Sequence, residues 1–130
     1  MPKPKKKYRN NYEKEFGDDL VKRKIEFSYE QVKLVYTKTY LVDFIIVTKS
    51  GKEIYIETKG AFRHGDTTKY RSVHRDNPDI DLRFIFFVDK YQRSAVNKKI
   101  PHTKITHGEW CDRNKFKYAV DTVPQEWLEE

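Results

Sequence analysis

The chain has 130 residues, enough for one domain with a modest core of its own. Hydrophobic residues make up 37% of the chain and charged residues 36%, and no apolar run approaches the ~18 residues of a membrane span. We therefore expect a soluble, cytoplasmic protein without a membrane partner. The single cysteine, Cys111, excludes an intrachain disulfide and is expected in the core.

The net charge of +7 indicates a polyanionic partner. Five basic residues precede the first acidic one, whereas the other 22 basic residues nearly balance the 20 acidic ones. Residues 1–8 are predicted to form a disordered basic arm and residues 9–130 one folded domain. The alternative for the arm is a solubilising tail or a targeting remnant. As a nucleic-acid contact it would bind the phosphate backbone without sequence specificity, through Lys3, Lys5, Lys6, Lys7 and Arg9.

A helix is predicted from Asn10, because Tyr12, Phe16 and Leu20 recur at helical spacing. Asn10 can cap this helix, with Glu13 at the third position of a capping box. Glu13 also shares a face with the apolar residues and would be able to approach a metal. The residues alone favour the capping role.

The segment 25–36 is predicted to be a long strand. Its apolar residues occupy odd positions up to Tyr29 and even positions from Val32 onward. Because alternate residues of a strand face opposite sides, this switch indicates a bulge, a bend or a change of partner. In a dimer, the chain would be able to cross over here.

Residues 39–60 are predicted to form a β-hairpin around a turn at positions 49–52. A three-residue loop with Gly51 at positive φ would place Asp43 opposite Glu57 on the neighbouring strand. A two-residue loop would instead place Asp43 opposite Thr58, on the other face. We expect the three-residue loop, with Lys59 on the same side as Glu57.

Two carboxylates so near each other repel unless a cation lies between them. Carboxylates together with water suit a hard divalent ion such as Mg2+. Lys59 would then orient or deprotonate a water, or neutralise charge on a phosphate. The alternative is a cross-strand ion cluster on the surface. Short motifs match by accident, and the spacing of Asp43, Glu57 and Lys59 alone favours that alternative.

After a loop over residues 61–66, Asp66 or Thr67 is predicted to cap a helix of about ten residues ending before Asn77. Basic residues gather on the loop and on this helix, and phosphate binding and an ordinary solvated face are equally supported for them. The cluster comprises Arg63, His64, Lys69, Arg71, His74 and Arg75.

The run Leu82–Val88 is almost wholly apolar and is predicted to be a strand buried on both faces, parallel to the strand that carries Glu57. Further on, a capping box over residues 106–109 opens a helix, residues 116–120 form an edge strand, and Pro124 opens a last turn that docks Trp127. The predicted fold class is α/β, with a mixed central β-sheet of about five strands flanked by helices.

The residues Asp43 and Glu57-Thr58-Lys59-Gly60 resemble the core of PD-(D/E)xK nucleases. From about residue 10 to residue 128 the chain is similar to the phage endonuclease I family of Holliday-junction-resolving enzymes. Two features depart from the pattern: Val42 stands where the wider motif has proline, and the segment between the first two strands is short. The motifs that carry the likeness are Glu13 at the start of a helix, Ile25-x-Phe27-x-Tyr29-Glu30, Ile56–Gly60, Gly108–Cys111 and Pro124-x-Glu126-Trp127.

The resemblance implies a metal-dependent, structure-selective DNA endonuclease that resolves four-way junctions by paired nicks leaving 5′-phosphates. It implies Mg2+ as cofactor, with Mn2+ as substitute, held by Asp43, Glu57, the Thr58 carbonyl and Glu13, while Lys59 assists the nucleophile. It also implies an intertwined, domain-swapped homodimer in which Glu13 acts on the partner's site, in the cytoplasm of the infected host if the protein is phage-encoded. Two alternatives stay open: a non-catalytic nucleic-acid-binding module, and a duplex nuclease of the same superfamily.

Overall fold

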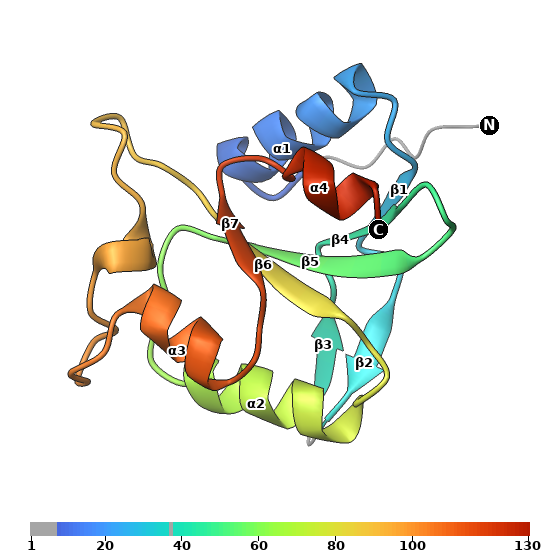
Figure 1. Cartoon of the computed structure of the whole chain (residues 1–130). Coiled ribbons are helices and arrows are strands. Elements are labelled where there is room, and N and C mark those ends of the chain that lie inside the picture. The colour runs from blue at the N-terminus through green and yellow to red at the C-terminus, as the bar shows by residue number, and fades with distance from the viewer. Residues whose placement is uncertain (1–7, 37) are drawn as a thin grey trace.

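A computed structural model describes residues 8–36 and 38–130 of the chain (Figure 1). The contacts expected of Lys3, Lys5, Lys6 and Lys7 lie outside these residues. The described part contains a five-stranded sheet and a two-stranded sheet. The larger sheet has the order β1 (Phe27–Tyr29), β4 (Phe44–Val47), β5 (Glu53–Lys59), β6 (Leu82–Phe86) and β7 (Tyr118–Val120).

The five-stranded sheet is mixed. Strands β1, β4 and β5 run antiparallel to one another, whereas β6 and β7 join β5 in parallel. All five residues of β6 are buried, because helices cover both faces of the sheet centre. The predicted α/β class, the five strands, the parallel central strand and the short edge strand are all confirmed.

Two helices cover each face of the sheet (Figure 1). Helices α1 (Asn11–Lys22) and α4 (Gln125–Leu128) pack on one face, and α2 (Asp66–Asp76) and α3 (His107–Arg113) on the other. A short 3-10 helix, η1 (Ala95–Asn97), packs beside α3. No helix within residues 8–36 and 38–130 is long and apolar enough to cross a membrane.

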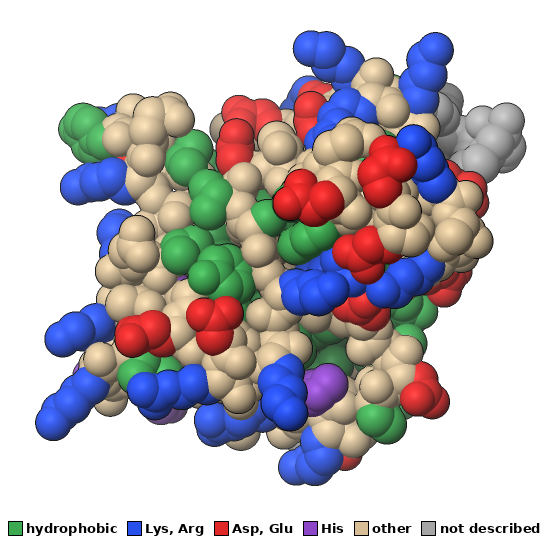
Figure 2. All heavy atoms as spheres, in the orientation of Figure 1, with side chains coloured by type: hydrophobic (Ala, Val, Ile, Leu, Met, Phe, Trp, Pro, Cys, Tyr) green, Lys and Arg blue, Asp and Glu red, His purple; other side chains and the backbone are tan. Residues whose placement is uncertain are grey.

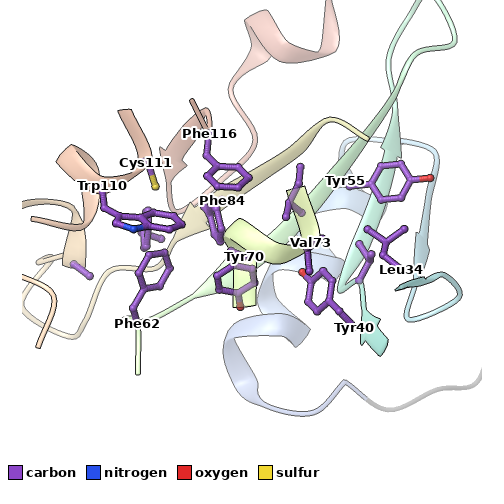
Figure 3. Packing of buried hydrophobic residues seen from close by; sticks show 14 of the residues in the cluster. Leu34, Tyr40, Tyr55, Phe62, Tyr70, Val73, Phe84, Trp110, Cys111 and Phe116 are labelled. Carbon is purple, nitrogen blue, oxygen red and sulfur yellow. The ribbon is translucent and has the colours of Figure 1, made fainter. Parts of the chain in front are cut away.

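Aromatic side chains fill the core between the sheet and helices α2 and α3 (Figure 3). The ring of Phe62 lies edge-on to Phe84 and Trp110, and Trp110 stacks on Phe116 with centroids 5.5 Å apart. Cys111 is fully buried among them, and burial raises the pKa of its thiol to about 12. Its predicted role in the core is confirmed.

The segment 25–36 was predicted as one long strand with a bulge, a bend or a change of partner; the structure divides it into two strands that change partner around Glu30. Strand β1 pairs with β4, whereas β2 (Lys33–Val35) pairs with β3 (Thr39–Leu41) in the separate small sheet. Glu30 has a φ of 50°, a left-handed conformation that turns the chain between the two sheets.

One expected strand is divided. The run from Thr39 to Val47 forms β3 and β4 in different sheets, with Val42 and Asp43 between them. The Val42 N–H donates to the Val32 carbonyl at 3.0 Å, and the Asp43 carbonyl accepts from the Glu30 N–H at 3.1 Å. The break in the hairpin strand therefore mirrors the bend at Glu30, because the two segments remain hydrogen-bonded as they change sheets.

The hairpin has the predicted three-residue loop. The Thr48 N–H donates to the Lys52 carbonyl at 2.8 Å, Gly51 has a φ of 90°, and Phe44 pairs with Ile56. Continuing this register by one residue brings Asp43 opposite Glu57, as predicted.

The helix ends agree in part with expectation. Thr106 and the third residue of α3 form the predicted capping box. Helix α2 is different, because Gly65 is its N-cap, in the left-handed conformation at φ 89°, and Asp66 is its first residue. The Asp66 carboxylate accepts the Arg63 N–H at 2.8 Å and so stabilises the loop that precedes the helix. Pro124 is the residue that precedes α4, one position earlier than predicted.

Candidate active site

A cleft of about 880 Å3 lies between the start of α1, the β2–β3 hairpin, the end of β5 and the start of α2. Strand β5 contributes the consecutive residues Glu57, Thr58 and Lys59 to its wall, and α1 contributes Glu13. Four residues that the sequence singles out for chemistry or metal binding therefore line one cleft.

Glu13 is held at the first turn of α1. Its N–H donates to the Asn10 side chain at 2.8 Å, which confirms the predicted helix cap. The Glu13 carboxylate does not complete the capping box, because it accepts from the Tyr29 hydroxyl and from the Arg9 guanidinium at 3.0 Å. Glu13 is only 3% exposed, so its side chain belongs to the buried wall of the site.

Asp43 immediately precedes β4 and is 1% exposed. One of its carboxylate oxygens accepts both the backbone N–H and the hydroxyl of Thr58, each at 3.0 Å. Carboxylate oxygens of Asp43, Glu13 and Glu30 lie within 4.8 Å of one another; we call these three side chains the carboxylate cluster. Glu30 was not predicted as a site residue, although the face switch marked its position in the chain.

Arg9 inserts its guanidinium into the carboxylate cluster. Its nitrogens lie 2.5 Å from Asp43, 3.0 Å from Glu13 and 2.6 Å from Glu30. Burial works to lower the pKa of Arg9, but the charges of Asp43 and Glu13 outweigh it and the pKa is raised. The sequence grouped Arg9 with the basic arm as a DNA contact, and it gave no sign of these ion pairs.

Negative charge in the cluster exceeds what one guanidinium can compensate. Burial and the charges of Glu57 and Glu13 raise the pKa of Asp43 to about 8, although the Thr58 N–H and Arg9 both act to lower it. A buried carboxylate whose pKa is raised, with two further carboxylates beside it, is a fitting donor set for a divalent ion. The residues present therefore fit the metal that the sequence motif implies.

Glu57 is held by different partners from Asp43. Its carboxylate accepts from the Tyr40 hydroxyl and, at 2.9 Å, from the Tyr70 hydroxyl, and it is 6% exposed. Burial raises the pKa of Glu57, while Lys59 and the two hydroxyls oppose the increase. Glu57 is not part of the carboxylate cluster, although its charge raises the pKa of Asp43.

This division of the two carboxylates has a structural cause. Asp43 lies just outside β4, where its carboxylate bonds to the backbone N–H and the hydroxyl of Thr58, whereas Glu57 lies within β5 and bonds to two tyrosine hydroxyls. The predicted cross-strand register is present, but Asp43 groups with Glu13 and Glu30, which the hairpin pattern alone could not indicate.

Lys59 lies beside Glu57, as the alternation of β5 predicted. Its Nζ is 3.8 Å from the Glu57 carboxylate and 3.1 Å from Asp66, and the Lys59 side chain is 18% exposed. The ammonium group is thus fixed between two acidic side chains at the cleft wall. The contact with Asp66 was not predicted.

The predicted basic cluster is divided by the structure. Arg63 and Lys69 line the cleft, and the Lys69 ammonium lies 4.8 Å from the centroid of the Tyr70 ring. These two residues therefore place positive charge next to Glu57 and Lys59.

The other members of the basic cluster do not line the cleft. His64, Arg71, His74 and Arg75 are exposed, and Arg75 forms a 2.8 Å ion pair with Asp76. Figure 2 shows Lys and Arg side chains along the edge of the molecule that contains α2, with acidic groups interspersed over α4. We expect these four residues to contribute less to a contact made inside the cleft.

Comparison with known proteins shows the family of the chain. The family model described as phage endonuclease I matches residues 2–130. The chain is 27% identical over 128 residues to Endonuclease I of Escherichia phage T7, covering 95% of this chain and 79% of that protein. It is also 27% identical over 128 residues to Endodeoxyribonuclease 1 of Enterobacteria phage T3, covering 95% and 78% respectively. The chain therefore belongs to the phage endonuclease I family.

Proposed function

We propose that the protein is a metal-dependent DNA endonuclease that resolves four-way junctions by paired nicks leaving 5′-phosphates. The observation that carries the proposal is the meeting of Glu13, Glu57, Thr58 and Lys59 in one cleft, with the buried Asp43 hydrogen-bonded to Thr58. The relatives named endonuclease and endodeoxyribonuclease support the same reaction class. A binding module without chemistry would have no use for several buried carboxylates whose ionisation is costly.

The cofactor in this proposal is Mg2+, with Mn2+ able to replace it. Asp43, Glu57, the Thr58 carbonyl and Glu13 would hold the ion, and the position of Glu30 makes it a further carboxylate available to the site. When bound, such an ion supplies positive charge to a phosphate and lowers the pKa of a water molecule. The three carboxylates of the cluster outnumber the single Arg9 guanidinium, which leaves negative charge for a divalent ion to compensate.

Lys59 is proposed to act on the substrate through its ammonium group. Its contacts with Glu57 and Asp66 fix Nζ at the cleft wall, where it can donate to a phosphate oxygen or exchange a proton with a nearby water. Asp66 would act as a positioning residue for Lys59. Arg63 and Lys69 would bind neighbouring phosphates, with the arm of residues 1–8 adding contacts that lack sequence specificity.

A homodimer is proposed as the working unit, because a four-way junction presents two equivalent scissile phosphates that match a two-fold pair of sites. In the structure, Glu13 meets Asp43 of the same chain through Arg9. If two chains exchanged α1 and β1 at the left-handed turn of Glu30, the same contacts would form between chains, and Glu13 would act in trans.

The variant Asp43→Asn tests the proposal. The nuclease should keep its affinity for a four-way junction within about threefold, because contacts with the phosphate backbone dominate binding. It should lose Mg2+-dependent cleavage by at least about a hundredfold, the scale of losing one electrostatic group in an active site. The exposed Asp79→Asn serves as a matched control that should cleave like the parent. Binding without any metal-dependent cleavage in the parent protein would instead identify a non-catalytic module.

A further inference from the structure

The guanidinium of Arg9 and the carboxylate cluster differ in how firmly they are held. The side chains of Asp43, Glu13 and Glu30 are 1%, 4% and 12% exposed, whereas that of Arg9 is 57% exposed. Arg9 is also one residue before the N-cap of α1 and is not part of the helix. The carboxylates are therefore held in fixed positions by the fold, whereas the Arg9 side chain can leave them without disturbing an element of secondary structure.

Arg9 and a divalent ion would need the same oxygens. The guanidinium contacts all three members of the carboxylate cluster, whose oxygens lie within 4.8 Å of one another. Two cations in so small a space repel each other strongly at the low effective dielectric of a buried site. Occupation by Arg9 and occupation by a metal are thus alternatives.

We propose that Arg9 is an exchangeable counter-cation: it partly compensates the charge of the carboxylate cluster before metal binds, leaves when a divalent ion enters, and then contacts a DNA phosphate. The inference rests on the proposed function for the presence of metal and DNA. Arg9 lines the same cleft as Lys59, Arg63 and Lys69, so its guanidinium remains among the residues proposed to face the substrate. The planar fork of arginine suits carboxylate and phosphate equally.

Such an exchange couples the two ligands. A metal ion that releases Arg9 adds a cationic group to the DNA-binding surface, and a phosphate that captures Arg9 leaves the cluster open to metal. By thermodynamic reciprocity, DNA then raises metal affinity by the same factor as metal raises DNA affinity. The site would be filled most readily when both ligands are present.

The first test measures Mn2+ affinity of the full chain without DNA, from the electron paramagnetic resonance signal of free Mn2+. Arg9→Gln should bind Mn2+ about tenfold more tightly or better, because a competing charge is removed from the site. Arg63→Gln is the matched control, since it removes the same charge from the same cleft without touching the carboxylate cluster, and its affinity should change much less. Arg9→Lys keeps the charge and should lie between the parent and Arg9→Gln.

The thermal midpoint serves as a second reading that does not depend on activity. Without metal, Arg9→Gln should melt below the parent because its carboxylates repel one another, and Mn2+ should raise its midpoint more than that of the parent. Equal or weaker Mn2+ affinity in Arg9→Gln would overturn the inference while leaving the proposed function intact. Absence of Mn2+ binding in every variant would instead overturn both the inference and the proposed metal dependence.

The second test follows the salt dependence of junction binding in a Lys59→Ala background, with and without Mn2+. If the released Arg9 contacts a phosphate, Mn2+ should steepen the slope of log affinity against log salt by about 0.9 more in the Arg9 protein than in its Arg9→Gln counterpart. Comparing the two proteins cancels any direct effect of Mn2+ on DNA. An equal change in both proteins would refute the phosphate contact.

Discussion

Replacing Asp43 by asparagine should stabilise the metal-free protein while abolishing its proposed activity. The pKa of Asp43 is about 8 in the folded chain against an ordinary 3.8, because burial and the charges of Glu57 and Glu13 disfavour its ionised form. Between these two values the folded state holds the proton more tightly than the unfolded state does. The free energy of unfolding therefore falls as pH rises from about 4 to about 8.

The magnitude follows from the size of the shift. A difference of about 4 pKa units at about 1.4 kcal/mol each gives an upper limit near 6 kcal/mol at pH 8. The asparagine oxygen can still accept the Thr58 hydrogen bonds, but its amide loses the ion pair with Arg9, which lies 2.5 Å from Asp43. We expect a net gain of about 2–3 kcal/mol, since loss of a charged hydrogen bond typically costs a few kcal/mol.

Urea unfolding in the presence of a chelator, at pH 5 and at pH 8, measures this effect. The parent should lose stability between the two pH values, Asp43→Asn should lose much less, and the exposed Asp79→Asn should behave like the parent. Mg2+ or Mn2+ at pH 8 should restore the parent but not Asp43→Asn. If Asp43→Asn is less stable than the parent at pH 8 without metal, Arg9 compensates the cluster fully and the reasoning is refuted.

Three further predictions concern the arm, the dimer and the support of Glu57. Deleting residues 1–7, which spares the contacts of the Tyr8 ring with Tyr29 and Phe44, should weaken junction binding and flatten its salt dependence while metal-dependent cleavage chemistry persists, and an unchanged salt slope would assign the arm to another role. Glu13→Gln and Lys59→Ala chains should each be inactive alone, but mixing them should restore one intact site per heterodimer and hence nicking without full resolution. If the mixture stays inactive although subunits are shown to exchange, Glu13 does not act in trans. Tyr70→Phe removes a hydrogen bond to the Glu57 carboxylate and should therefore raise the pKa of Glu57 and lower the affinity for Mn2+. Tyr55→Phe, in the same core but without that hydrogen bond, should change neither. Equal effects of the two variants would indicate that Tyr70 has a packing role only.

Local sequence rules predicted much of the fold because they depend on near neighbours. The alternation around Gly51 and the length of its loop determine the hairpin register, and the apolar run of β6 identifies the buried central strand. The switch of face after Tyr29 indicated a bulge, a bend or a change of partner, and the structure shows the change of partner. The rule for helix starts gave the wrong cap for α2, because Gly65 takes the capping position and Asp66 instead bonds to the preceding loop.

The contact partners of the site residues could not be predicted from the sequence, because they depend on how distant segments of the chain pack together. The pattern places Asp43 opposite Glu57, but it carries no information about Arg9 or Glu30, which reach Asp43 through the packing of α1 and β1. It equally gives no reason for two tyrosine hydroxyls to meet Glu57 from β3 and α2. Such contacts join residues far apart in the chain and need the folded structure.

Competition between a four-way junction and a linear duplex of matched sequence tests the central claim most directly. With both substrates present in Mg2+, the protein should cut the junction at two symmetrically related phosphates, leave 5′-phosphate ends, and cleave the duplex at least about a hundredfold more slowly, a preference worth about 2.7 kcal/mol. Chelation of the metal should stop both reactions. Equal cleavage of junction and duplex would contradict the account and would identify an ordinary duplex nuclease built on the same site.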